Sequence, residues 1–173
     1  MNLESYIRDV PDFPKKGIIF KDITTLVGNA EALRETIAQL AAPFAKAGIE
    51  KVVGIESRGF IFGAAVAAVL GAGFVPVRKP GKLPAKTIAK SYDLEYGTST
   101  VELHVDAIEK GQKVLVIDDL LATGGTLAAA CDLIAQEGGQ IVAVAVVVEL
   151  SFLDGRKKLP GLDVQSLIKV TGE

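Results

Sequence analysis

The sequence contains a single cysteine, Cys131, so no disulfide can form within the chain. That fits a reducing compartment, and we expect a cytoplasmic protein. The cysteine lies in an alanine-rich stretch that is predicted to be helical, where a small buried apolar side chain is its ordinary role. The first residues, MNLESYIRDVPDF, carry acidic side chains and no apolar core, so a secretory signal is not predicted.

The sequence also lacks a long run of one charge sign. With 19 basic and 21 acidic residues the net charge is −2, and nucleic acid is disfavoured as a partner because backbone binding needs a basic face. Residues 60–77 carry no charge, a length that raises the question of a membrane span. Three glycines and Pro76 interrupt this segment. We therefore predict a buried helix followed by a strand, and no membrane partner.

Several common catalytic and cofactor motifs are missing. His104 is the only histidine and has no cysteine or second histidine at ligand spacing, so a metal site around it is not predicted. The chain has no GxSxG nucleophile turn, no GxxxxGK[ST] loop and no GxGxxG run. The sequence thus favours neither covalent hydrolysis nor the usual nucleoside-triphosphate and dinucleotide sites.

The composition is that of one globular domain, with 173 residues, 49% hydrophobic and 23% charged. Short Val/Ile/Leu-rich runs alternate with helical segments, which predicts an α/β fold with a mainly parallel central sheet flanked by helices. The expected strands are 51–55, 74–77, 114–117 and 141–148, and the expected helices are 30–47, 60–70 and 127–137. Residues 154–173 have mixed charge and receive no firm assignment.

Two segments differ from this pattern. Residues 1–28 contain Pro11 and Pro14 and predict an irregular arm or hood on the core, which spans 29–173 in the same compact domain. Residues 79–105 are rich in Lys, Pro, Gly and Ser, with β-like pieces at 88–92 and 99–103, and we expect a flexible β-ribbon lid. The basic residues around this lid, taken alone, indicate a solvated loop. They are Arg78, Lys79, Lys82, Lys86 and Lys90.

The most informative segment is 114–126, VLVIDDLLATGGT. A predicted buried strand leads to Asp118 and Asp119, and a Thr-Gly-Gly-Thr turn then enters a helix. Ligands bind at the carboxyl ends of parallel strands, and glycines before a helix suit a phosphate monoester. Paired carboxylates suit ribose hydroxyls and can help to hold Mg²⁺ through water. An ordinary strand end explains one acid and one glycine, but not two acids, two glycines and two threonines together.

A second segment, 52–60 or VVGIESRGF, has the same strand-to-helix layout. Its predicted strand ends in Glu56, Ser57 and Arg58. Arginine offers a fork of donors that matches phosphate oxygens. Alone, this segment is better interpreted as an ordinary turn with an exposed arginine. When this segment is considered together with 114–126, the interpretation as a second anion site is favoured.

These runs resemble known motifs. Residues 114–126 are similar to the phosphoribosyl diphosphate signature of type I phosphoribosyltransferases, and Leu-Leu-Ala-Thr-Gly-Gly-Thr and Glu-Ser-Arg-Gly-Phe resemble the adenine-specific branch of that family. The resemblance runs from Pro11 to about Leu159. It implies transfer of the 5-phosphoribosyl group from 5-phospho-α-D-ribose 1-diphosphate (PRPP) to N9 of adenine, giving AMP and diphosphate. It also implies Mg²⁺ as cofactor and a homodimer.

The resemblance further implies roles for individual residues. Glu95, packed by Tyr96, assists proton transfer at the purine, and Arg58 assists departure of the diphosphate. Phe20 stacks on the base while neighbouring backbone groups read its Watson–Crick edge. A cis peptide joins Glu56 and Ser57, and Arg78 crosses a dimer interface. The implied ribose and 5′-phosphate contacts are Asp118, Asp119, Ala122, Thr123, Gly124, Gly125 and Thr126; the diphosphate contacts are Glu56, Ser57, Arg58, Arg78, Lys79 and Lys82; the adenine contacts are Ile19, Phe20 and Lys21.

Other interpretations stay open at this point. The chain could use hypoxanthine, guanine, xanthine or orotate, although the hood and the Glu-Ser-Arg-Gly-Phe run favour adenine. It could also be a regulator that binds nucleic acid and uses PRPP as an effector, but its length leaves no room for an added domain. Taken alone, Phe20 could be an apolar anchor of the arm, and Glu95 an exposed loop residue.

Overall fold

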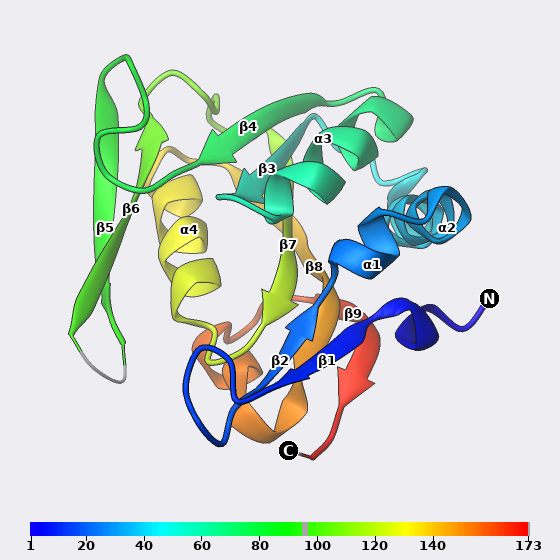
Figure 1. Ribbon diagram of the computed structural model, residues 1–173. Coiled ribbons are helices and arrows are strands. Elements are labelled where there is room, and N and C mark those ends of the chain that lie inside the picture. Colours follow the sequence, from blue (N-terminus) through cyan, green and yellow to red (C-terminus); the bar gives the residue numbers. More distant parts are fainter. Residues whose placement is uncertain (95–96, 173) are drawn as a thin grey trace.

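The computed structural model describes residues 1–94 and 97–172. Its centre is a five-stranded parallel sheet (Figure 1). The strands are β3 (Lys51–Ile55), β4 (Gly73–Val77), β7 (Lys113–Leu121), β8 (Gln140–Leu150) and β9 (Val164–Val170). They follow the order β4-β3-β7-β8-β9 across the sheet. The predicted α/β class with a mainly parallel sheet is confirmed.

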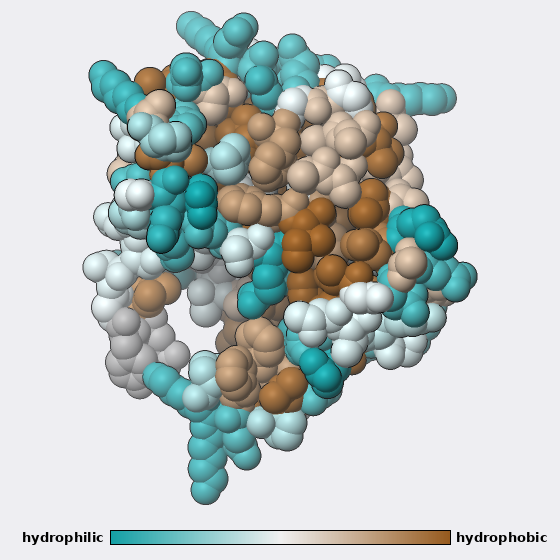
Figure 2. Space-filling view, turned by 45° about the horizontal axis from the view of Figure 1, so that its top comes forward, coloured by the Kyte–Doolittle hydropathy of each residue, from teal (hydrophilic) through white to brown (hydrophobic). Residues whose placement is uncertain are grey.

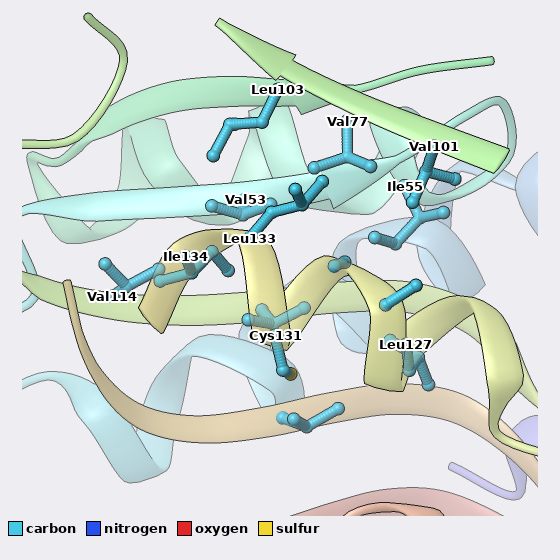
Figure 3. Close-up of a cluster of buried hydrophobic side chains, with 14 of the residues drawn as sticks. Val53, Ile55, Val77, Val101, Leu103, Val114, Leu127, Cys131, Leu133 and Ile134 are labelled. Carbon is cyan, nitrogen blue, oxygen red and sulfur yellow. The ribbon is translucent and has the colours of Figure 1, made fainter. Parts of the chain in front are cut away.

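Helices cover both faces of this sheet, as the uninterrupted apolar strands predict. The helices α2 (Ala30–Ala41) and α3 (Gly59–Leu70) lie on one face, and α4 (Gly125–Gln136) lies on the other. Successive residues of a strand point to opposite faces, so Val53 joins the core beneath α4 while Val52 joins the core beneath α2 and α3. Figure 3 shows the core beneath α4, which includes Leu133 and Cys131. Burial raises the pKa of the Cys131 thiol to about 12, so it is an inert core residue as predicted.

The predicted helix 30–47 is shorter than expected. It begins after Asn29, whose side chain accepts hydrogen bonds from two backbone N–H groups of the first turn. It ends at Ala41, and the 3₁₀ turn η2 (Ala42–Phe44) follows. Pro43 explains the difference, because proline has no N–H to continue the helical ladder. Residues 60–77 form α3 and β4 as predicted, and no helix in the described ranges is long and apolar enough to cross a membrane.

The N-terminal arm is more regular than predicted. It consists of η1 (Leu3–Tyr6), an antiparallel hairpin of β1 (Arg8–Pro11) and β2 (Ile19–Asp22), and the one-turn helix α1 (Thr24–Val27). Two ion pairs tie the hairpin strands together, Arg8 with Asp22 and Lys21 with Asp9. Strands of four residues with charged side chains give little periodic signal, which explains why the sequence indicated only an irregular arm.

The predicted ribbon is present as β5 (Thr87–Asp93) and β6 (Thr98–His104), which pair antiparallel beside α4 (Figure 1). Val101 and Leu103 of β6 are buried in the core beneath α4 (Figure 3), so the base of the ribbon belongs to the folded core. His104 Nε2 accepts a hydrogen bond from the backbone N–H of Ala85 at 3.3 Å. The unassigned tail forms η3 (Ser151–Leu153), η4 (Gly155–Lys158) and the edge strand β9.

Candidate active site

A cleft of about 350 Å³ opens at the carboxyl ends of β3 and β7. These strands are parallel neighbours, so the loops that follow them meet at one edge of the sheet. The cleft is lined by residues 55–58, Lys79 and residues 118–127. The structure thus brings together the two loops that the sequence singled out as anion sites, although they lie some sixty residues apart in the chain.

The first loop leaves the sheet later than the sequence predicted. The strand was expected to end at Ile117, whereas β7 continues to Leu121 and carries both aspartates within it. It continues because its pairing with β8 extends from Asp118 to Leu121. Residues 122–124 then form a tight turn into α4, with Gly124 at φ +81° in the left-handed region. The first residues of α4 line the cleft, and the free backbone N–H groups of a helix N-terminus suit a phosphate group.

The two aspartates differ in environment. Asp118 Oδ1 accepts the backbone N–H of Asp119 at 2.9 Å, and Asp119 Oδ2 accepts Arg58 Nε at 2.5 Å. Burial, followed by the neighbouring charge of Asp119, raises the pKa of Asp118 well above its usual value. A Cβ at Gly59 would lie only 2.8 Å from Asp118 Oδ1, so glycine is what allows the second loop to sit against this carboxyl group.

The second loop contains the cis peptide bond between Glu56 and Ser57 that the family resemblance implies. Glu56 receives Arg78 Nε and Nη2, both at 3.1 Å, and the backbone N–H of Lys79 at 2.9 Å. The hydrogen bonds from Arg78 lower the pKa of Glu56, so this carboxylate stays charged. The Arg78 guanidinium is therefore paired with Glu56 of its own chain. The contact across a dimer interface that the resemblance implies stays a prediction.

The two lysines of the predicted diphosphate set lie differently. Lys79 lines the cleft, and its Nζ donates to Ser99 Oγ at 2.9 Å and to the Tyr92 hydroxyl at 3.4 Å. Lys82 lies on the adjoining turn, where its carbonyl accepts Arg78 Nη1 at 3.4 Å, and it is not part of the cleft lining. The structure therefore brings Lys79, but not Lys82, to the cleft.

The three predicted adenine contacts lie together on β2, above the second loop. The Arg58 guanidinium lies 5.4 Å from the centroid of the Phe20 ring, and the Phe13 ring packs edge-on against it at 5.2 Å. Ile19 is 44% exposed, and the Lys21 ammonium is held by Asp9 at 2.7 Å. Phe20 is thus the hood residue that contacts the second loop, through Arg58. Glu95 and Tyr96 lie outside the described residues.

Tyr92, which the sequence did not single out, contacts two residues of the cleft wall. The Tyr92 hydroxyl accepts Thr126 Oγ1 at 2.9 Å, which connects the ribbon to the first loop, and also contacts Lys79. A tyrosine in a short β-like piece carries no signal of this contact, because the ribbon meets α4 only in the fold. In the part of the chain that the structure describes, no group of three or more His, Cys, Asp and Glu side chains is arranged to hold a metal.

Comparison with known proteins agrees with this geometry. The sequence profile of the phosphoribosyl transferase domain matches residues 22–165. An adenine phosphoribosyltransferase of Geotalea uraniireducens is 57% identical over 167 residues, which are 96% of this chain and 98% of that protein. The chain belongs to the adenine phosphoribosyltransferase family. A second member, from Thermobifida fusca, is 55% identical and covers 97% of this chain and 96% of its own length.

Solved adenine phosphoribosyltransferases share the fold. The enzyme of Thermoanaerobacter pseudethanolicus has a TM-score of 0.94 and 51% identity, covering 97% of this chain and 98% of its own. The Saccharomyces cerevisiae enzyme, solved with adenine and an imino-altritol bisphosphate, has a TM-score of 0.90 and 40% identity, covering 95% and 96%. The resemblance and the type I phosphoribosyltransferase fold expected from the sequence are confirmed.

Proposed function

We infer that this chain is an adenine phosphoribosyltransferase, which transfers the 5-phosphoribosyl group of PRPP to N9 of adenine and releases AMP and diphosphate. The observation that carries this conclusion is one cleft in which an aspartate–glycine loop and an arginine loop meet beneath an aromatic hood. The adenine phosphoribosyltransferase of Geotalea uraniireducens matches 96% of the chain at 57% identity. The reaction class is therefore transfer of a pentosyl group in purine salvage.

The first loop is the proposed site of the sugar phosphate. Asp118 and Asp119 accept hydrogen bonds from the ribose hydroxyls through their carboxyl oxygens. Residues 122–126 bind the 5′-phosphate with backbone N–H groups and the hydroxyls of Thr123 and Thr126. The support is the tight turn at the N-terminus of α4 and its position in the cleft wall.

The second loop is the proposed site of the diphosphate. Glu56, Ser57 and Arg58 border the cleft from the β3 side, and Lys79 borders it from the ribbon side. Arg58 lies between the aspartates and the Phe20 ring, and this position supports a role for its positive charge in departure of the diphosphate. We also retain Arg78 and Lys82 as contacts made when the adjoining turn closes on the ligand.

The proposed reaction breaks the bond between the sugar's anomeric carbon and the diphosphate oxygen, and N9 of adenine attacks from the opposite face. The sugar passes through an oxocarbenium-like state, so the protein contributes positioning and charge stabilisation. Phe20 stacks on the base, and backbone groups of Ile19 and Lys21 read its edge. The fixed Lys21–Asp9 pair supports a backbone role for Lys21, since its ammonium is already occupied.

Mg²⁺ is the proposed cofactor. The hard carboxylate oxygens of Asp118 and Asp119 in the cleft fit a magnesium ion held mainly by substrate and water. When bound, the ion supplies positive charge to the diphosphate. We expect excess EDTA to reduce AMP formation at least about a hundredfold, and added Mg²⁺ to restore it. Unchanged AMP formation in EDTA-treated, metal-free buffer would exclude this cofactor.

Initial rates with PRPP and each of adenine, hypoxanthine, guanine and orotate test the function. We expect AMP formation to dominate, because the hood presents the base contacts of the adenine branch. A faster rate with hypoxanthine would make the substrate assignment wrong. A protein that binds PRPP in the presence of Mg²⁺ but forms no AMP would instead be a regulator.

Glu95 is proposed as the group that assists proton transfer at the purine. We expect Glu95→Gln to lower kcat about a hundredfold, because the amide cannot exchange a proton, and to leave the KM for PRPP within about threefold. Steady-state kinetics with both substrates varied measure this split. The matched control is Glu109→Gln at an exposed position away from the cleft. Unchanged turnover in Glu95→Gln would remove the residue from the mechanism.

A homodimer is proposed through the outward face of α3. The helix carries no charged residue, and its Ile61 and Val69 are 41% and 63% exposed. Figure 2 looks toward this side of the molecule and shows brown and tan side chains gathered in one area. A helix that is apolar on all sides is normally buried on all sides, so a second copy is the natural cover.

The double variant Ile61→Glu/Val69→Glu tests this interface. We expect it to sediment with the mass of one chain at micromolar concentration, because burying two carboxylates costs more than the interface gains. Ala38→Glu, on the exposed face of α2, is the control and should keep the mass of the unaltered protein. A dimeric double variant would place the interface elsewhere.

Cytoplasmic location also stays a prediction, supported by the single buried cysteine.

A further inference from the structure

The turn between β8 and β9 packs against the back of the first loop. A Cβ built on Gly124 would overlap the carbonyl oxygen of Gly155, and a Cβ built on Gly155 would overlap that of Ala122. The two backbone segments therefore lie so close together that neither glycine position has room for a side chain. This contact fixes the position of residues 122–124 relative to the turn.

Gly155 is buried and is not part of the cleft lining, whereas every residue from Ala122 to Thr126 is. It begins η4, directly after Asp154 at φ 55°. Any effect of Gly155 on a bound ligand therefore passes through the loop that it touches.

An ion-pair network anchors the turn. Arg156 donates from Nε and Nη2 to the two carboxylate oxygens of Glu149 at 2.6 and 2.7 Å, and from Nη1 to the carbonyl of Val164 at 2.7 Å. The Ser166 hydroxyl donates to Glu149 at 2.6 Å. Glu149 is only 4% exposed, and hydrogen bonds from Arg156 lower its pKa, so it stays ionised.

The network is attached where the first loop begins. In the β7–β8 ladder Glu149 is the partner of Leu121, the last residue of β7 before the loop. The Arg156 fork thus joins the turn to β8 and β9 at the same level of the sheet at which residues 122–126 leave it. The contact between Gly155 and Ala122 is therefore anchored on both sides by the central sheet, because Ala122 follows β7 and Arg156 is bound to β8 and β9.

We propose that Gly155 and the Arg156–Glu149 pair form a positioning platform that holds the first loop in the geometry needed for the 5′-phosphate of the donor. The inference rests on the proposed function and extends it to residues outside the cleft. Recognition by backbone N–H groups depends on their positions, because a backbone cannot compensate by changing rotamer. The platform thereby sets the affinity for the sugar phosphate and not for the base.

The test is Gly155→Ala, whose added methyl group must displace Ala122. We expect the KM for PRPP and the Kd for ribose 5-phosphate to rise roughly tenfold, while the KM for adenine stays within about twofold. Gly139→Ala is the matched control. Its Cβ would lie 2.8 Å from Ile134 Cγ2 and 3.0 Å from Ile108 Cγ2, in the core at the other end of α4. It also adds a methyl group at a tight contact, here against side chains and not backbone, and should leave the PRPP and ribose 5-phosphate constants unchanged.

Arg156→Lys is a second variant that keeps the charge and loses the fork. We expect its KM for PRPP to rise about threefold, with adenine again unaffected. The proposal is overturned if folded Gly155→Ala has an unchanged KM for PRPP, or if Gly139→Ala shows an equal rise. If Gly155→Ala does not fold, an unchanged KM for PRPP in Arg156→Lys overturns it. If the unaltered protein makes no AMP, the proposed function is wrong but the platform is not. The platform is still tested by the binding of ribose 5-phosphate to the variants.

Discussion

Replacing Arg58 by alanine is expected to lower kcat/KM for PRPP about a thousandfold, the largest loss among single substitutions in the cleft. The guanidinium contacts both the aspartate pair and the hood, through Asp119 and the Phe20 ring. In the proposed reaction it stabilises charge on the departing diphosphate. Steady-state rates of AMP formation at varied PRPP measure the loss.

Two further variants define what the arginine contributes. Arg58→Lys keeps the charge but loses the fork and the stacking on Phe20, so we expect it to recover no more than about tenfold of the loss. Arg34→Ala, at an exposed position on α2, should retain the original kinetics. A loss of less than about tenfold in Arg58→Ala would mean that another cation carries the diphosphate.

Asp118→Asn is expected to lower kcat/KM for PRPP about a hundredfold and to make the folded protein more stable. The fall in kcat/KM follows from replacing a carboxyl group that is proposed to accept ribose hydroxyls by an amide, since a hydrogen bond to a charged group contributes about 1.5–3 kcal/mol. The gain in stability follows from the raised pKa of Asp118, which shows that its environment disfavours the charged form.

The direction of the pH dependence can be derived from that raised pKa. Between the unfolded value, near 3.8, and the higher folded value, the folded protein binds more protons than the unfolded protein, so the free energy of unfolding falls as pH rises. Asparagine does not titrate. The stability advantage of Asp118→Asn should therefore be absent below about pH 3 and grow to about 1 kcal/mol towards neutral pH.

Urea unfolding at pH 3.5 and pH 7 measures this difference. Asp106→Asn, in an exposed turn, is the control and should change neither stability nor PRPP affinity beyond small surface effects. If Asp118→Asn were less stable than the unaltered protein at pH 7, the carboxylate would be stabilised in its charged form, and its proposed exchange with ligand hydroxyls would need another explanation.

The sheet and its main helices could be predicted from the sequence because they depend on local patterns. Uninterrupted apolar runs such as 51–55 indicate buried parallel strands, and glycines such as Gly71 end helices in the left-handed region. The 52–60 and 114–126 segments were each predicted as strand-to-helix anion loops, but only the fold shows that their strands are neighbours and that the loops meet. The cis bond at Glu56 followed only from family resemblance.

The remaining differences depend on contacts that are distant in sequence. The extension of β7 to Leu121 depends on pairing with β8, and no local signal marks it. The edge strand β9 mixes polar and apolar residues because one side is partly exposed, so its period is weak. Gly155 looks like an ordinary turn glycine until the fold places it against Ala122.

The cleft has a further consequence through the pairing of its arginines. Arg58 is already bound to Asp119 and Arg78 to Glu56, so each cation carries its own counter-ion. An anionic ligand therefore competes with these carboxylates for the arginines and does not meet unneutralised cations. A simple anion such as inorganic phosphate offers the arginines no advantage over the acids they hold, whereas a sugar phosphate also offers hydroxyl donors to the released carboxylates. The internal ion pairs thus make the cleft selective for a ligand that offers both an anion to the arginines and hydrogen-bond donors to the carboxylates.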